Sequence, residues 1–253
     1  NTKAIQNAID AGGTVYIPEG VFVTGTLHLK SGGGLYLAPN SVLKASHSYS
    51  DYNDPDYCPQ NRIFISENMA GTHLISAVEQ ENVFIAGYGC IDGDSHYWVN
   101  DKHNIPNTVF FGHPPKKDNR PGQMIFFAEC KNVKVSDVKL LHSPFWHLFF
   151  HGCEDVQVRG ITVNGETRQW VNDGIDIDCC KRVTVSDCII NTGDDGITLR
   201  AVSKNLKYSD GICEDVVVSN CVLTSYVDYG IRIGVGDGLI RNCLFSNIII
   251  KNS

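Results

Sequence analysis

A repeated four-residue corner, each time followed by a short apolar strand, constrains the fold of this chain more than any other feature. Each corner has Cys or Gln first, a charged residue second and Val fourth. The corners occupy residues 80–83, 130–133, 153–156, 180–183 and 213–216. The last four start 23, 27 and 33 residues apart, and the first interval of 50 residues is expected to hold two turns. Such spacing is typical of a solenoid.

The repeats contain short strands bounded by Gly, Pro and Asn, and no helix, which argues against leucine-rich and ankyrin repeats. We therefore expect an all-β chain, a single parallel β-helix domain over residues 1–253. Apolar residues in 1–10 follow a helical rhythm, so an N-terminal helix is expected to cap the first coil. The chain starts without Met and stops just after an apolar run. We expect it to be trimmed from a longer parent, with truncation at the C-terminus.

In a β-helix, residues at the same place in successive coils lie roughly 4.8 Å apart. The repeat register predicts an inward column of free cysteines and three columns around the later coils. The cysteine column holds Cys130, Cys153, Cys180 and Cys213. The second column holds Asp173, Asp195 and Tyr229, and the third holds Phe126, Phe149, Asp176, Thr198 and Arg232. The fourth column holds His151, Asp178 and Arg200.

This register brings Asp173, Asp194 and Asp195 together, although each Asp-Gly alone reads as a turn. Like charges this close raise at least one pKa, which costs stability and points to function. Strand alternation places Asp176 and Asp178 on the outer surface of the coil, where Asp178 can form a structural ion pair with Arg200. A calcium site built from the same acids is the chemical alternative.

The segments 172–176 and 193–197 resemble the two acid motifs of the polygalacturonases, glycoside hydrolase family 28. Segments 87–93 and 143–146 also resemble family features. The resemblance implies a single-stranded right-handed parallel β-helix of the pectin lyase type. It implies an inverting hydrolase of galacturonan or a related pectic chain, with Asp194 as general acid and Asp173 and Asp195 holding the attacking water. We expect carboxyl separations of roughly 6.5–9.5 Å from the acid.

Two positions depart from the family pattern. Tyr229 stands where a Gly-His-Gly segment is expected, and the chain ends before the family's Arg-x-Lys strand, for which Arg232 is at most a substitute. The candidate substrate-binding residues are Tyr229, Arg232, Arg200, His151 and Trp170. Trp146 and Trp170 are either sugar-stacking platforms or packing residues.

Composition limits the partners. A formal charge of -7 disfavours nucleic acid binding, and no apolar run is long enough to span a membrane. Ten cysteines without C-x-x-C spacing predict neither a zinc site nor a disulfide scaffold, and no metal or cofactor is expected. We expect an acidic polysaccharide or oligosaccharide substrate and a secreted or periplasmic location. The alternatives are a calcium-dependent polysaccharide lyase and a non-catalytic glycan-binding β-helix.

Overall fold

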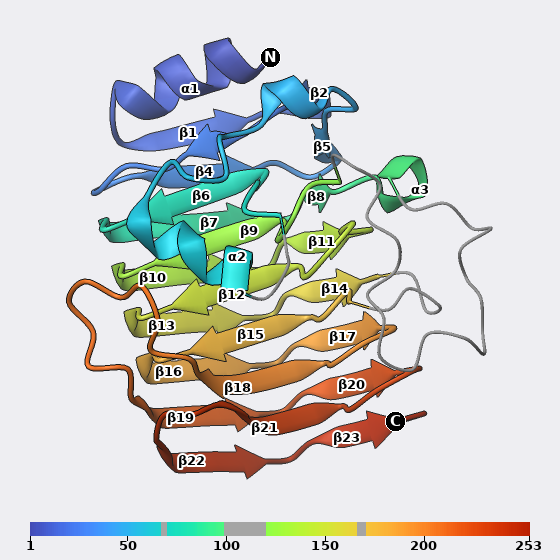
Figure 1. Cartoon of the computed structure of the whole chain (residues 1–253). Helices are drawn as coiled ribbons and strands as arrows, with labels where there is room; N and C mark the ends of the chain where they lie inside the picture. The colour runs from blue at the N-terminus through green and yellow to red at the C-terminus, as the bar shows by residue number, and fades with distance from the viewer. Residues whose placement is uncertain (67–69, 99–119, 166–170) are drawn as a thin grey trace.

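The chain winds into a β-helix of three parallel sheets, as Figure 1 shows for the computed structural model. The structure describes residues 1–66, 70–98, 120–165 and 171–253. Each strand pairs with the equivalent strands of the coils before and after it, and sheets A and B have eight strands each. The predicted right-handed parallel β-helix of about eight or more coils is confirmed.

The strand bounds follow the coil order. Sheet A contains β1 (Thr14–Ile17), β4 (Gly34–Leu37), β7 (Glu81–Gly87), β10 (Lys131–Ser136), β13 (Glu154–Arg159), β16 (Lys181–Ser186), β19 (Cys213–Ser219) and β22 (Ile240–Ser246). Sheet B contains β2 (Gly20–Thr24), β5 (Ser41–Ala45), β8 (Cys90–Asp92), β11 (Lys139–Leu141), β14 (Thr162–Asn164), β17 (Ile189–Thr192), β20 (Val222–Ser225) and β23 (Ile249–Lys251). Sheet C contains β3 (Leu27–His28), β6 (Ile75–Val78), β9 (Ile125–Ala128), β12 (Leu148–His151), β15 (Ile175–Asp178), β18 (Ile197–Ala201) and β21 (Ile231–Gly236).

The corners turn the chain from sheet C into sheet A. Their third residue has a left-handed backbone, with φ of 56° at Asn82, 52° at Asn132, 56° at Asp155 and 57° at Asp215. Four of the five corners have Asn or Asp here, which tolerate this region because their short polar side chains bond locally; the fifth has Arg182, with φ of 54°. The corner sequence therefore encodes the bend that makes each coil.

The inside of the coil is apolar, and the predicted column of Cys130, Cys153, Cys180 and Cys213 is fully buried with free thiols. One part of the coil count was wrong. Strand β7 pairs directly with β10, so the first 50-residue interval is a single coil carrying an insertion and not two turns.

The predicted capping helix is α1 (Thr2–Asp10), which buries Ile5 and Ile9 over the first coil. Gln6 also pairs with the edge of β3, because its amide donates to the His28 carbonyl and accepts from the His28 amide. The other helices are η1 (Tyr49–Asp51), η2 (Pro59–Arg62), α2 (Ile63–Ser66) and α3 (Ser95–Trp98). Among the described residues, no helix has the length and apolar character needed to cross a bilayer.

The outer face of sheet C is covered, which corrects the expectation for Asp176 and Asp178. Both point away from the coil interior, in register with Thr198 and Arg200, yet both are fully buried. In Figure 1, α2 lies over β9 and β12 on this face. The chain thus adds an outer layer that the repeat pattern does not encode.

Candidate active site

Three carboxyl groups meet where the chain turns from sheet B into sheet C. Asp173 precedes β15, and Asp194 with Asp195 precedes β18; we call them the acid trio. The Gly174 amide donates to the Asp195 carbonyl at 2.9 Å, and the Gly196 amide donates to the Tyr229 carbonyl at 2.8 Å. The predicted column of Asp173, Asp195 and Tyr229 is therefore confirmed.

The glycine after each acid lets the coils approach closely at this point. A Cβ atom on Gly174 would lie 2.4 Å from the Gly196 carbonyl oxygen, and one on Gly196 would lie 2.6 Å from the Gly230 carbonyl oxygen. No side chain fits at either position. The Asp-Gly pairs are thus a packing requirement as well as turns.

One oxygen from each carboxyl of the trio lies within 4.8 Å of one from each of the other two. These contacts are closer than the separation of roughly 6.5–9.5 Å expected for an inverting pair. The distances also suit three ligands of one divalent cation, since calcium binds oxygen at roughly 2.3–2.6 Å. The oxygen distances alone therefore do not select the stereochemistry.

Asp194 is held by backbone groups of its own turn and of the preceding coil. Its Oδ2 accepts from the Val171 amide at 2.6 Å, and its Oδ1 accepts from the Asp195 amide at 3.0 Å. The Asn172 side-chain oxygen accepts from the amides of Gly193 at 2.8 Å and Asp194 at 3.0 Å. Sequence reasoning missed Asn172 and Val171; the only available signal was an Asn just before an acid in the motif.

Asp195 and Asp173 have different surroundings. Asp195 accepts from the Tyr229 amide at 3.2 Å through Oδ1 and pairs with the Arg232 guanidinium at 3.1 Å through Oδ2. Asp173 is buried, and its Oδ1 has no hydrogen-bond partner among the described residues. Asp173 therefore has an acceptor oxygen to spare for a water or a substrate.

Burial is the first cause of every pKa shift in the trio. It raises the pKa of Asp173 well above its ordinary value, with further raising by Asp194. Burial also raises the pKa of Asp194, although the Val171 amide opposes it. Burial and the charge of Asp194 raise the pKa of Asp195 to about 6, although the positive charge of Arg232 lowers it. Carboxyls this close share protons, so the trio keeps at least one near neutral pH.

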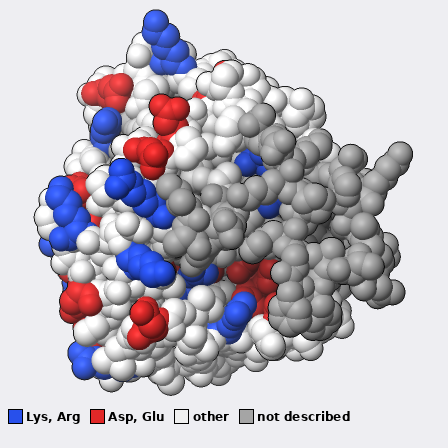
Figure 2. Space-filling model, in the orientation of Figure 1, with Lys and Arg blue, Asp and Glu red and all other residues white. Residues whose placement is uncertain are grey.

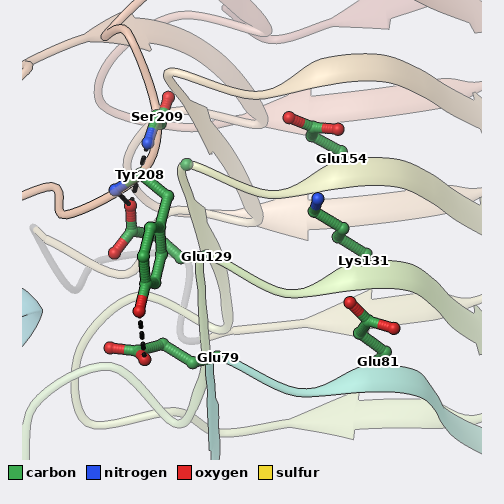
Figure 3. Close-up of a pocket in the computed structure, with 8 residues that line it drawn as sticks. Glu79, Glu81, Glu129, Lys131, Glu154, Tyr208 and Ser209 are labelled. Carbon is green, nitrogen blue, oxygen red and sulfur yellow. Dashed lines mark hydrogen bonds between the residues drawn. The ribbon is translucent and has the colours of Figure 1, made fainter.

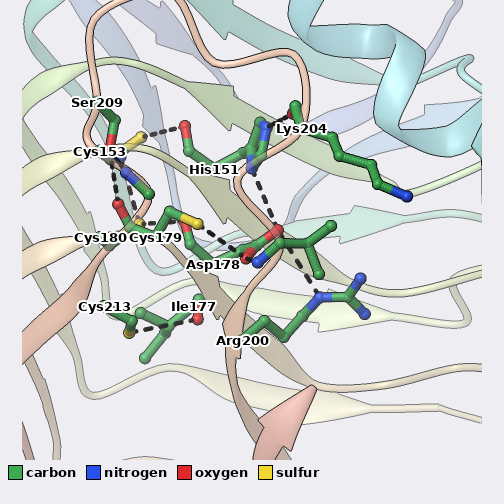
Figure 4. Close-up of polar contacts among 12 residues, drawn as sticks. His151, Cys153, Ile177, Asp178, Cys179, Cys180, Arg200, Lys204, Ser209 and Cys213 are labelled. Atoms are coloured by element: carbon green, nitrogen blue, oxygen red, sulfur yellow. Dashed lines mark hydrogen bonds and ion pairs between the residues drawn. The ribbon is translucent and has the colours of Figure 1, made fainter. Parts of the chain in front are cut away.

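His151 and Arg200, predicted to bind substrate, are both buried, and that role stays a prediction. Figure 4 shows them around Asp178: His151 Nδ1 lies 3.2 Å and Arg200 Nε 3.9 Å from Asp178 Oδ2. The other ring nitrogen of His151 lies 3.2 Å from the Lys204 carbonyl. All three side chains are at least 95% buried. We call them the buried network; the predicted Asp178–Arg200 pair exists, but inside the protein.

Several side chains of the described residues around the trio are exposed to solvent. Asp194 is partly exposed, Tyr229 is 56% exposed, and the Arg232 side chain is 46% exposed. Figure 2 shows acidic and basic side chains next to each other in a hollow of the face seen in Figure 1.

The family model described as "Glycosyl hydrolases family 28" matches residues 15–216, which is most of the chain. This chain belongs to glycosyl hydrolase family 28. It is 29% identical over 213 residues to a probable polygalacturonase of Vitis vinifera, covering 79% of this chain and 41% of that protein. An endo-polygalacturonase of Pectobacterium parmentieri is 29% identical over 210 residues, with 79% of this chain and 51% of that protein covered.

Solved structures agree with the family assignment. The hyperthermoactive exopolygalacturonase of Thermotoga maritima superposes with a TM-score of 0.74 at 25% identity, covering 98% of this chain and 62% of that one. The chain spans about half the length of the curated relatives it matches. Two family 28 features stay predictions: the role of Tyr229 at the family's histidine position, and substrate binding by Arg232. Trp170 lies outside the described residues.

A separate pocket of about 350 Å³ lies at the other end of the sheet C strands, lined by Glu79, Glu81, Glu129, Lys131, Gly152, Glu154, Tyr208 and Ser209 (Figure 3). Glu129 Oε1 accepts the amides of Lys207, Tyr208 and Ser209. The carboxylate therefore fixes the 202–212 insertion against the coil. The described contacts of this insertion are with this pocket and the buried network.

Proposed function

We propose that this family 28 protein hydrolyses galacturonan or a related acidic pectic chain through the acid trio. The observation that carries the proposal is the convergence of three carboxyls from adjacent coils, with raised pKa values and an unpartnered oxygen on Asp173. Structural acids are normally paired or hydrogen-bonded, so such a cluster costs stability and favours catalysis. The polygalacturonase names of the relatives support the substrate class.

In the proposed reaction, Asp194 protonates the leaving glycosidic oxygen as the bond to the anomeric carbon breaks. A water held by Asp173 and Asp195 adds to that carbon from the opposite face and gives its proton to one of them. Asp194 is partly exposed and therefore able to reach the leaving oxygen. Since the trio shares protons, the proton that Asp194 donates can rest elsewhere in the trio before substrate binds.

The test is a reducing-sugar assay on polygalacturonate with NMR of the first product. We expect new reducing ends and an anomer opposite to the substrate linkage, because one displacement by water inverts the centre. A product with retained configuration would contradict the water-holding roles of Asp173 and Asp195. In that case one of these acids acts as a nucleophile at the short distance observed.

A calcium-dependent lyase is the second candidate, since the trio's oxygens are close enough to share a divalent cation. Arg232, 3.1 Å from Asp195, would be the nearby base that a lyase needs. A chelator separates the two reactions. A hydrolase keeps its activity and forms no absorbing unsaturated product, whereas a lyase loses its activity.

The glycan-binding alternative has its own signature. A non-catalytic protein binds pectic fragments and releases no reducing ends, with or without calcium. We propose an extracellular or periplasmic site of action, because pectic polymers lie outside the cytoplasm. Oligogalacturonate binding by calorimetry, run beside the reducing-sugar assay, distinguishes binding from turnover.

A further inference from the structure

The segment 143–147 leads into β12, one coil before the acid trio, and is folded tightly on itself. Ser143 Oγ donates to the Trp146 carbonyl at 2.9 Å and accepts from the Phe145 amide at 3.3 Å. Trp146 is 7% exposed, and the Arg200 guanidinium lies over its ring at 4.6 Å, so this ring packs inside the protein. His147, the last residue of the segment, is fully buried. The segment therefore holds His147 in fixed surroundings.

Both ring nitrogens of His147 have hydrogen-bond partners that allow only one direction of donation. Nδ1 lies 2.9 Å from the Asp173 carbonyl oxygen, which can only accept, and Nε2 lies 3.3 Å from the Ser143 amide, which can only donate. Nδ1 must therefore carry the hydrogen, and Nε2 must be bare. Burial, the first cause, lowers the pKa of His147 to about 4. The ring is thus a neutral imidazole with one defined tautomer.

This imidazole is bound to the coil that carries Asp173. Strand β12 pairs with β15 (Figure 1), and the His147 backbone amide also donates to the Asp173 carbonyl, at 2.8 Å. A side-chain group and a backbone group of one residue thus hold the same carbonyl. A Cβ atom on Gly165 would lie 2.9 Å from Cε1 of the His147 ring and 2.6 Å from Nδ2 of Asn172. Only glycine leaves room for the ring and for Asn172 at this point.

The carboxyl of Asp173 depends on such support more than the other two acids of the trio do. Both carboxyl oxygens of Asp194 accept backbone amides. Those of Asp195 accept a backbone amide and pair with Arg232. Asp173 Oδ1 has no partner among the residues that the structure describes. The direction of this carboxyl therefore depends chiefly on the backbone of Asp173, and the carbonyl of that backbone is the group that His147 holds.

We propose that His147 is the positioning residue of Asp173: the hydrogen bond from its Nδ1 fixes the Asp173 peptide and so aims the carboxyl at the attacking water. His147 itself contacts neither sugar nor water, because it is fully buried. This inference rests on the proposed hydrolase function and adds to it a residue outside the trio. A misaimed catalytic group lowers turnover, whereas ground-state binding by exposed groups is unaffected. Loss of the Nδ1 donor should therefore lower kcat and leave KM unchanged.

The test is a pair of substitutions that each keep one of the two ring contacts. His147→Asn places its amide nitrogen where Nδ1 stands and keeps a donor to Asp173, whereas His147→Gln places its amide near Nε2 and keeps only the contact with Ser143. In steady-state kinetics on polygalacturonate, His147→Gln should lower kcat by up to about 10²-fold at unchanged KM. His147→Asn should keep most of the parent's kcat. Equal kcat values for the two variants, or a raised KM at the parent's kcat, would overturn the proposal.

The matched control is His73→Gln. His73 is also fully buried, and its ring nitrogens lie 2.8 Å from the Gln123 carbonyl oxygen and 2.8 Å from Asn61 Oδ1. It precedes β6, three coils before Asp173. His73→Gln should lower the melting temperature about as much as His147→Gln does, while the folded protein keeps the parent's kcat. An equal fall of kcat in both variants would mean that His147 supports only the fold.

A measurement on the unmodified protein tests the tautomer directly. Nitrogen-15 NMR of the histidine side chains should show a neutral His147 with its hydrogen on Nδ1 between about pH 5 and pH 8, because a hydrogen on Nε2 would point at the Ser143 amide. A hydrogen on Nε2, or a charged ring in this range, would overturn the proposal even if neither variant folds. Absence of hydrolysis by the parent, with this tautomer present, would overturn the proposed function and leave His147 as a structural residue.

Discussion

The acid trio and the buried network lie at opposite ends of the same two strands, β15 and β18, yet they meet opposite conditions. In the buried network, Asp178 faces His151 and Arg200 and accepts the Val202 amide at 2.8 Å. In the trio, carboxyls face one another, and Asp173 Oδ1 has no partner among the described residues. Burial alone therefore does not distinguish the two groups: the charges of the buried network face opposite charges, whereas the carboxyls of the trio face one another.

The largest expected effect is the loss of turnover in Asp194→Asn. The amide keeps the size of the side chain but cannot donate the proton, and losing a general acid lowers turnover by roughly 10²–10⁴-fold. The circular dichroism spectrum should be unchanged. The matched control is Asp187→Asn, an exposed acid paired with Arg159, which should keep the parent's rate. A near-native rate in Asp194→Asn would refute the general-acid role.

The second effect should appear in stability, through Asp178→Asn in the buried network. It leaves the buried Arg200 without its facing charge, and breaking such a pair costs about 3–5 kcal/mol of the free energy of unfolding. Urea denaturation measures this loss. Arg182→Gln, which breaks an exposed pair with Asp155 and Glu154, should cost about 1 kcal/mol or less. If Asp178→Asn unfolds like the parent but loses turnover, the network belongs to the site.

The repeat register allowed both groups to be predicted in place from the sequence. Once the corners align the coils, strand pairing fixes that Asp173 lies beside Asp195 and that Asp178 lies beside Arg200. Exposure could not be predicted, because the covering segments carry no repeat signal. The η2 and α2 segment and the 202–212 insertion bury this face through contacts such as Phe64 on Phe149 and Val202 on Asp178.

The same limit explains the contacts at Asp194. Its bond from Val171 depends on a left-handed backbone with φ of 70°, which a β-branched residue rarely adopts. No local rule assigns that conformation to Val. The sequence therefore located the acids but not the backbone groups that hold them.

The third effect is a pH-dependent gain in stability from Asp195→Asn. The folded-state pKa of Asp195 is about 6, above the ordinary value near 3.9. The folded protein therefore binds this proton more tightly, and that stability is present at pH 4 and lost as the pH rises through 6. Asp195→Asn avoids the loss, so its free energy of unfolding should exceed the parent's at pH 8 by up to about 3 kcal/mol, and not at pH 4.

For comparison, the stability that Asp187 contributes should depend on pH in the opposite direction. Hydrogen bonding from Asn220 is the first cause that lowers the pKa of Asp187, so its contribution is present above the ordinary pKa and lost on acidification. Thermal melts of the parent and both variants between pH 4 and pH 8 measure how the stability of each depends on pH. A constant difference for Asp195→Asn would mean that its carboxyl is no more strained in the folded state than in the unfolded chain.

The smallest expected effect on folding stability is that of Arg232→Ala. This variant compares the half-exposed ion pair of the acid trio with the ion pair of the buried network. Arg232 pairs with Asp195 as Arg200 faces Asp178, but its side chain is 46% exposed against 5% for Arg200. The half-exposed guanidinium of Arg232 stays partly hydrated, so its loss should lower the melting temperature less than Asp178→Asn does. The exposed guanidinium is available to a uronate carboxylate, so its loss should raise KM far more than it lowers kcat. Kinetics on galacturonate oligomers, with Arg159→Ala as an exposed control, measure both constants. An unchanged KM with a falling kcat would assign Arg232 to holding Asp195 and remove it from substrate binding.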